Sequence, residues 1–166
     1  MLARNSVILV VAIAIGCEQT YRRSADDMAI VFGNVQALNA VEASTNVTAF
    51  RLPKRSYYRE KLAEYKILSG PISLSNDAQA RLRSVLLDPA MYEKHRTNCV
   101  PDYGVRFQFK HNGKEVDVLL CFECEILGVY EDGDVGHMES FSPGRAHFVR
   151  LVKELFPDDA EIATLQ

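Results

Sequence analysis

The stretch that decides the fold covers residues 105–122 and reads VRFQFKHNGKEVDVLLCF. Apolar and polar residues alternate on both sides of Asn112-Gly113, a dipeptide typical of the two-residue turn that closes a β-hairpin. A turn at this dipeptide places apolar residues opposite one another in three pairs: Phe109 with Val116, Phe107 with Val118, and Val105 with Leu120. Because the pattern and the turn agree, we predict an antiparallel hairpin with this register.

The segments around this hairpin show either helical or strand periodicity. Helices are predicted at residues 25–40, after the cap residue Ser75, and after Ser142-Pro143. Strand-like segments are predicted at 47–52, 65–74 and 126–130. This order of elements predicts an α+β domain with a mainly antiparallel sheet and about three helices packed on one face.

The composition indicates one folded domain rather than a disordered chain. Of the 166 residues, 48% are hydrophobic and 25% are charged, which is close to ordinary globular usage. The formal net charge is -3, and acidic and basic residues are interspersed along the chain. No basic stripe is present in the sequence, which argues against nucleic acid as the main partner.

The first 16 residues have the pattern of an export signal. Arg4 precedes a run of apolar residues at 7–15, which is shorter than the roughly 20 residues that a spanning helix needs. Small Ala14 and Gly16 stand just before Cys17, and this arrangement resembles the lipobox of bacterial lipoproteins. Ala14 occupies a position where that motif most often has leucine.

The resemblance implies that the chain is cut before Cys17 and that acyl chains are attached to its thiol. We therefore predict a signal peptide at 1–16, a lipid-anchored tether at 17–23 and a single domain at 24–166. The mature protein would stay on a membrane of the bacterial cell envelope and face the periplasm or the exterior, because two or three acyl chains anchor a domain stably. An uncleaved anchor, a plain secretory signal and a cytosolic protein with an apolar start are the alternatives.

Three cysteines remain when Cys17 is reserved for lipid. Disulfides persist outside the cytoplasm, so we expect one bridge and one free thiol. Extending the hairpin register brings Cys124 close to Cys99 on one face of the sheet, and a bridge between them closes a loop of 26 residues. A bulge at 122–123 would instead pair Cys99 with Cys121, and a chain with no bridge at all is the third alternative.

The same cysteines support a second hypothesis, in which the chain is a thiol-redox or metal-handling protein. Cys121 and Cys124 have the two-residue spacing of thiol oxidoreductases, but those enzymes place the first cysteine at a helix N-terminus. The three thiols together with His95 include the right ligand types for Zn²⁺, although their spacing fits no ribbon or finger pattern. No hydrolase, phosphate-binding or dinucleotide motif is present in the sequence, so no catalytic residue and no cofactor is assigned.

A basic, aromatic segment connects two of the predicted strands. It could contact a protein partner or anionic lipid, or it could be a solvated linker. Its residues are Lys54, Arg55, Tyr57, Tyr58, Arg59 and Lys61. The segment from Cys99 to Cys124 is similar to stretches of uncharacterised bacterial proteins, a resemblance that implies no activity. The sequence thus favours a non-enzymatic binding or structural module with a possible protein partner in the envelope, and a thiol-redox or metal-handling protein is the alternative.

Overall fold

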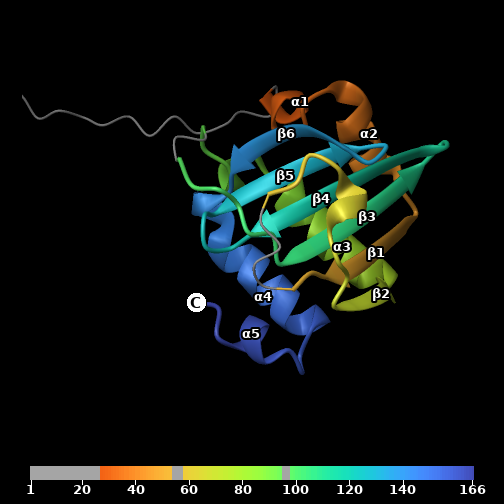
Figure 1. Ribbon diagram of the computed structural model, residues 1–166. Helices are drawn as coiled ribbons and strands as arrows, with labels where there is room; N and C mark the ends of the chain where they lie inside the picture. Colours follow the sequence, from red (N-terminus) through yellow and green to blue (C-terminus); the bar gives the residue numbers. More distant parts are fainter. Residues whose placement is uncertain (1–26, 54–57, 95–97) are drawn as a thin grey trace, which may run out of the picture.

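A computed structural model describes residues 27–53, 58–94 and 98–166. Its centre is a six-stranded sheet in the order β2-β1-β3-β4-β5-β6, and every neighbouring pair of strands is antiparallel (Figure 1). The strands are β1 (Asn46–Arg51), β2 (Ser69–Ser73), β3 (Val105–His111), β4 (Lys114–Cys121), β5 (Ile126–Glu131) and β6 (Asp134–Ser140). The predicted α+β class with a mainly antiparallel sheet is confirmed.

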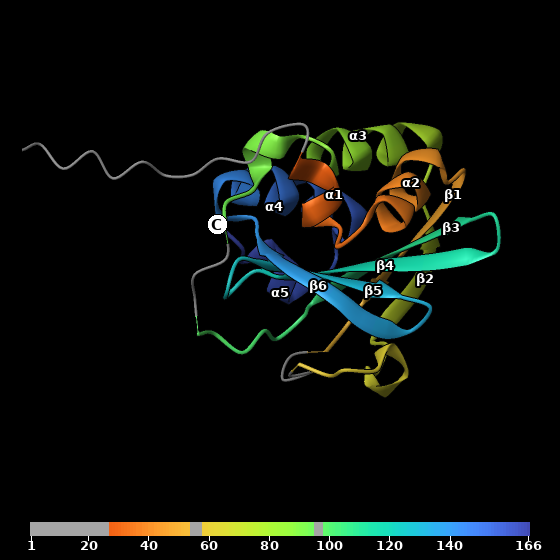
Figure 2. The ribbon, with the colours of Figure 1, turned by 90° about the horizontal axis from the view of Figure 1, so that it is seen from above.

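Helices cover one face of this sheet, as Figure 2 shows from above. They are α1 (Met28–Val31), α2 (Val35–Ala43), α3 (Asn76–Leu86) and α4 (Arg145–Leu155). A further short helix, α5 (Ala160–Ala163), and three 3₁₀ turns, η2 (Leu62–Glu64), η3 (Pro89–Met91) and η4 (Ser142–Gly144), complete the list. Within the described ranges, no helix is both long and apolar enough to cross a membrane.

The hairpin of β3 and β4 has the register that the sequence predicts, with Phe109 opposite Val116 and Phe107 opposite Val118. Asn112 and Gly113 both have positive φ, 48° and 76°, as the expected turn requires. The β5–β6 hairpin repeats this device at Asp132 and Gly133, with φ of 49° and 92°.

Three elements differ from the prediction. The helix expected at 25–40 is two helices, because Gly33 has φ of 86° and Asn34 then caps α2 by accepting a hydrogen bond from the N–H of Ala37 at 2.8 Å. The last helix begins at Arg145, after the 3₁₀ turn η4, rather than at Ser142-Pro143. Strand β6 was not expected, because its sequence DVGHMES has weak β propensity. It lies at the edge of the sheet, where a strand pairs with only one neighbour.

The sheet has an apolar core on each of its faces. The larger core lies between the sheet and the helices and includes Phe107, Phe109, Leu82 and Phe148. The second core lies on the opposite face, where residues 58–65 cover β4 and β5. Its members are Leu52, Leu62, Tyr65, Tyr103, Leu119, Cys121, Ile126 and Tyr130.

Candidate functional site

The cysteines gather at the end of the sheet where β4 turns into β5. The structure pairs Cys99 with Cys124, whose Cα atoms lie 5.9 Å apart, and leaves Cys121 as a buried free thiol. Cys121 is still in register with Ile126, so residues 122–125 form the turn and Cys124 lies outside the ladder. Of the two pairings expected from sequence, the structure has the one that uses Cys124.

The thiol of Cys121 lies between the two backbone segments that the disulfide joins. Its Sγ accepts hydrogen bonds from the N–H of Asp102 at 3.3 Å and from the N–H of Cys124 at 3.4 Å. Burial raises the pKa of this thiol, and these N–H donors lower it to a smaller extent. A buried protonated thiol is a weak nucleophile and a weak metal ligand.

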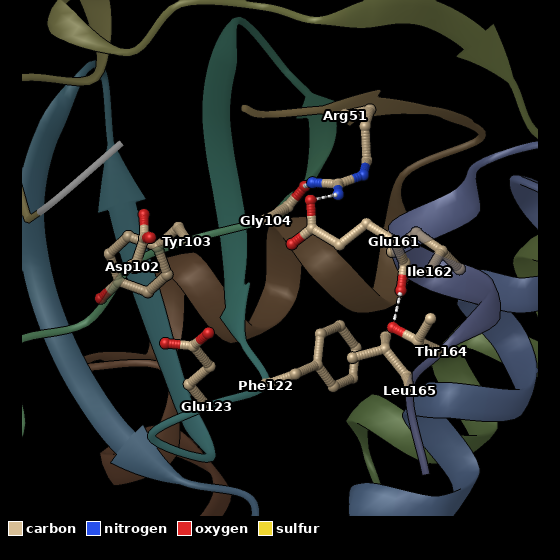
Figure 3. A pocket seen from close by; sticks show the side chains of 10 residues that line it. All are labelled: Arg51, Asp102, Tyr103, Gly104, Phe122, Glu123, Glu161, Ile162, Thr164 and Leu165. Carbon is tan, nitrogen blue, oxygen red and sulfur yellow. Dashed lines mark hydrogen bonds and ion pairs between the residues drawn. The ribbon is translucent and has the colours of Figure 1, made fainter. Parts of the chain in front are cut away.

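A hollow of about 150 Å³ lies between the turn after β4 and the C-terminal segment (Figure 3). Asp102 and Glu123 contribute carboxylates from one side, Glu161 of α5 points to Arg51 from the other, and Phe122 and Ile162 add apolar surface. Ligand pockets for drug-sized molecules are usually about 300 Å³ or more, so this hollow admits only a small molecule.

Arg51 lines this hollow and forms hydrogen bonds to three segments of the chain. Its side chain is only 1% exposed. The guanidinium donates to the backbone oxygens of Leu52 and Gly104, to Asp159 Oδ2 at 2.9 Å and to Glu161 Oε2 at 2.6 Å. Because its donors are engaged by the chain itself, we assign Arg51 a structural role at the join between β1 and α5.

A wider groove of about 590 Å³ lies on the sheet face that carries the second core. One wall is the segment around η2, where Leu62 and Tyr65 are buried and Ile67 is 50% exposed. The other wall is formed by Arg106, Glu115, Asp132 and Gly133 of the two hairpins. The groove therefore combines an apolar wall with a charged one, which is the composition of a protein-contact surface.

The charged wall rests on a buried ion pair. Arg106 Nε donates to Asp117 Oδ1 at 2.6 Å, and its guanidinium lies over the ring of Phe50 at 4.7 Å from the centroid. Burial raises the pKa of Asp117 to about 6, although the hydrogen bond and charge of Arg106 oppose the rise. Among the described residues, Asp117 Oδ2 has no hydrogen-bond partner.

The predicted basic, aromatic segment is only partly described. Tyr58 packs against the second core, and the Arg59 carbonyl accepts a hydrogen bond from the Tyr130 hydroxyl at 2.6 Å. Lys61 forms an exposed ion pair with Asp134. Lys54, Arg55 and Tyr57 lie outside the described residues. The described part of the segment is therefore attached to the sheet. The sequence did not signal this, because the Tyr130 hydroxyl and the Asp134 carboxylate lie 71 and 73 positions from their partners.

Two other predicted positions, Cys17 and His95, also lie outside the described residues. Within the ranges that the structure describes, no three His, Cys, Asp or Glu side chains are grouped so that they could hold a metal ion. The disulfide occupies two of the three thiols that the zinc hypothesis needs.

The chain matches no protein-family model, no curated protein and no solved structure.

Proposed function

We propose that this chain is a lipid-anchored protein of the bacterial cell envelope, held to its membrane through Cys17. The single observation that carries the proposal is the combination, in one chain, of a lipobox-like N-terminus with a cysteine pair at disulfide distance. Disulfides persist in oxidising compartments and are rare in the cytoplasm. Export of the domain accounts for both features.

We further propose that the domain is a non-enzymatic binding module whose partner is another envelope protein. The groove of about 590 Å³ supports this role, because it joins exposed Ile67 and neighbouring Leu68, 50% and 59% exposed, to the charged side chains of two hairpins. Exposed apolar residues bordered by charges are typical of protein-binding surfaces.

Lipid attachment is tested by growing cells with an alkyne analogue of palmitate and separating membrane from soluble fractions. Wild-type protein should carry the label and sediment with membranes, and Cys17→Ser should lose both properties. Cys121→Ser is the matched control and should keep both. Equal labelling of wild type and Cys17→Ser would refute the anchor.

The binding role is tested by placing a photo-crosslinking amino acid at Leu68, beside the groove, in living cells. A discrete crosslinked product should form at this position. The same amino acid at exposed Asn39 on α2 is the control and should not form that product. Identical products at the two positions, or none at Leu68, would remove the groove from the proposal.

A second candidate function is thiol exchange within the cysteine group. It is favoured by the position of Cys121 Sγ, which is hydrogen-bonded to segments on both sides of the disulfide. In such a step the Cys121 thiol would lose its proton to water and attack Cys124 Sγ. A Cys121–Cys124 bond would form, the Cys99–Cys124 bond would break, and Cys99 would leave as a thiolate that takes up a proton. No external oxidant or reductant is needed, because one disulfide replaces another.

Alkylation without reductant separates the two candidates. Exchange would expose Cys99 to a thiol reagent in the folded protein, and Cys121→Ser would abolish that reaction. An inert bridge would leave Cys99 unmodified in both proteins.

A further inference from the structure

The outer surface of the helix layer differs in charge from the rest of the molecule. Helices α3 and α4 together carry Arg81, Arg83, Arg145, Arg150 and Lys153 against Asp77 and Glu154. Their net charge is therefore +3 in a chain whose formal net charge is -3, so the remaining residues carry -6. Arg145 is paired with Glu125 at 3.1 Å, and Arg83 donates to backbone oxygens of Val41 and Ser44, so Arg81 and Arg150 are the exposed arginines of this surface. Such an asymmetry creates a positive field on one side of a small domain.

Arg81 of α3 and Arg150 of α4 border a groove of about 190 Å³ between these two helices. Buried Leu151 and partly buried Val85 form its apolar part. Arg81, His147 and Arg150 are exposed around it, and Ser84 contributes a hydroxyl. This is a shallow site in which an anionic group would meet guanidinium donors above an apolar base.

The acidic member of the groove does not cancel this charge. Glu154 pairs with Arg81 at 3.2 Å, but the two side chains are 47% and 56% exposed. Exposed ion pairs of this kind contribute little free energy and exchange readily with other partners. Arg81 can therefore turn to a phosphate group without a large cost.

The chain enters the domain on this same side of the sheet. Helix α1, which begins at Met28, lies in one layer with α2, α3 and α4 (Figure 2). Nine residues separate Cys17 from Asp27 in the sequence. Such a segment spans at most about 33 Å when fully extended, so a lipid on Cys17 keeps the domain within about one domain diameter of the membrane.

We infer that the α3–α4 surface, defined by Arg81, Ser84, His147 and Arg150, rests on the anionic phospholipid headgroups of the membrane that holds the anchor. The inference rests on the proposed lipid anchor and adds an orientation to it. The helix layer faces the membrane, and the groove beside Ile67 faces away from it toward a protein partner. Attraction to anionic lipid favours contact by a factor of about five for each basic residue near the surface.

The chain contains no tryptophan, so a single introduced tryptophan reports on one place alone. Ser84→Trp places the probe on the proposed membrane surface, and Ile67→Trp places it on the opposite side of the sheet; both positions are exposed. Each full-length, lipidated variant is reconstituted into vesicles of phosphatidylcholine with phosphatidylglycerol. A fraction of the phosphatidylcholine is brominated near the headgroup and quenches nearby indole fluorescence.

We expect strong quenching at Ser84→Trp and weak quenching at Ile67→Trp, and a loss of the difference in vesicles of phosphatidylcholine alone. Adding Arg81→Glu and Arg150→Glu should reduce the quenching at Ser84→Trp in the anionic vesicles. Lys110→Glu, an exposed change on the opposite face, should not reduce it. Equal quenching at the two positions, or stronger quenching at Ile67→Trp, would overturn the inference.

Mass spectrometry of each sample before reconstitution distinguishes a failure of the proposed lipid anchor from a failure of the proposed orientation. A chain without acyl groups would overturn the anchor and this inference together. An acylated chain with quenching on the wrong side would overturn the orientation alone and would direct attention to the basic residues around Arg59 and Lys61.

Discussion

Asp117 is a buried carboxylate in the middle of the sheet, and its environment makes stability depend on pH. Burial raises its pKa from 3.8 to about 6 in the folded protein. The folded state therefore binds this proton more tightly than the unfolded state does. The stabilisation is fully present below about pH 4 and is lost as the pH rises through 6.

We predict that Asp117→Asn removes this dependence. The free energy of unfolding of wild type minus that of the variant should fall by about 2 kcal/mol between pH 4 and pH 7, since one pKa unit corresponds to about 1.4 kcal/mol and the unfolded carboxyl is already partly ionised at pH 4. Urea unfolding of both proteins at several pH values measures the difference. Asp158→Asn, at an exposed position, is the control and should leave the difference nearly flat; a flat line for Asp117→Asn as well would contradict the assignment.

Arg51 has a geometry that lysine cannot reproduce. Its planar guanidinium reaches two backbone oxygens and two carboxylates from a single buried position. We predict that Arg51→Lys lowers the free energy of unfolding by about 3 kcal/mol, within the range for breaking a buried ion pair. Glu161→Gln should cost clearly less, because that carboxylate is 34% exposed and can be hydrated. Chemical denaturation of the three proteins tests this ranking.

The short helices α1 and α2 depend on the turn between them. Gly33 has φ of 86°, and a Cβ at this position would lie 3.0 Å from Cβ of His137 on β6. Gly113 in the β3–β4 turn also has positive φ, but a Cβ there would meet nothing within 4 Å. Substituting each glycine therefore distinguishes the cost of a left-handed backbone, which both positions share, from the cost of a steric contact, which only Gly33 has.

We predict that Gly113→Ala costs about 1 to 2 kcal/mol, the usual penalty for a left-handed alanine. Gly33→Ala should cost more, because His137 or the turn itself must also move. Thermal unfolding of both variants gives the comparison. Equal losses of stability in the two variants would contradict this prediction, because the contact with His137 of β6 would then add no free-energy cost.

Local signals in the sequence predicted the elements that local chemistry controls. The β3–β4 hairpin follows from its alternation and its Asn-Gly turn, and α3 follows from the Ser75 cap, whose Oγ accepts a hydrogen bond from the N–H of Ala78. Strand β6 has only half of this signal. The Asp132-Gly133 dipeptide is typical of a hairpin turn, but the strand that follows it lacks the apolar alternation that identifies β3 and β4.

The functional surfaces were less predictable than the elements. The cysteine pairing could be narrowed to two possibilities from the hairpin register, and the turn at 122–125 decided between them. The buried Arg51 cluster joins residues more than 100 positions apart, and the groove beside Ile67 needs three separate segments. Neither the Arg51 cluster nor the groove could be recognised from a single stretch of sequence.

At the scale of the whole molecule, the sheet separates two surfaces with different chemistry. The helix layer carries net positive charge, and the opposite face carries the second core and the groove. An anchor at Cys17 would make this asymmetry useful, since one surface could meet anionic lipid while the other meets a protein. The proposed membrane location and the proposed orientation both depend on the modification of Cys17.

Intact mass spectrometry of the protein from its own membrane fraction tests that modification most directly. The sample is alkylated in denaturant without reductant before the mass is measured. We expect a chain that lacks residues 1–16, carries acyl chains and takes up one alkyl group, on Cys121. A chain that begins at Met1 and carries no acyl group would contradict this expectation.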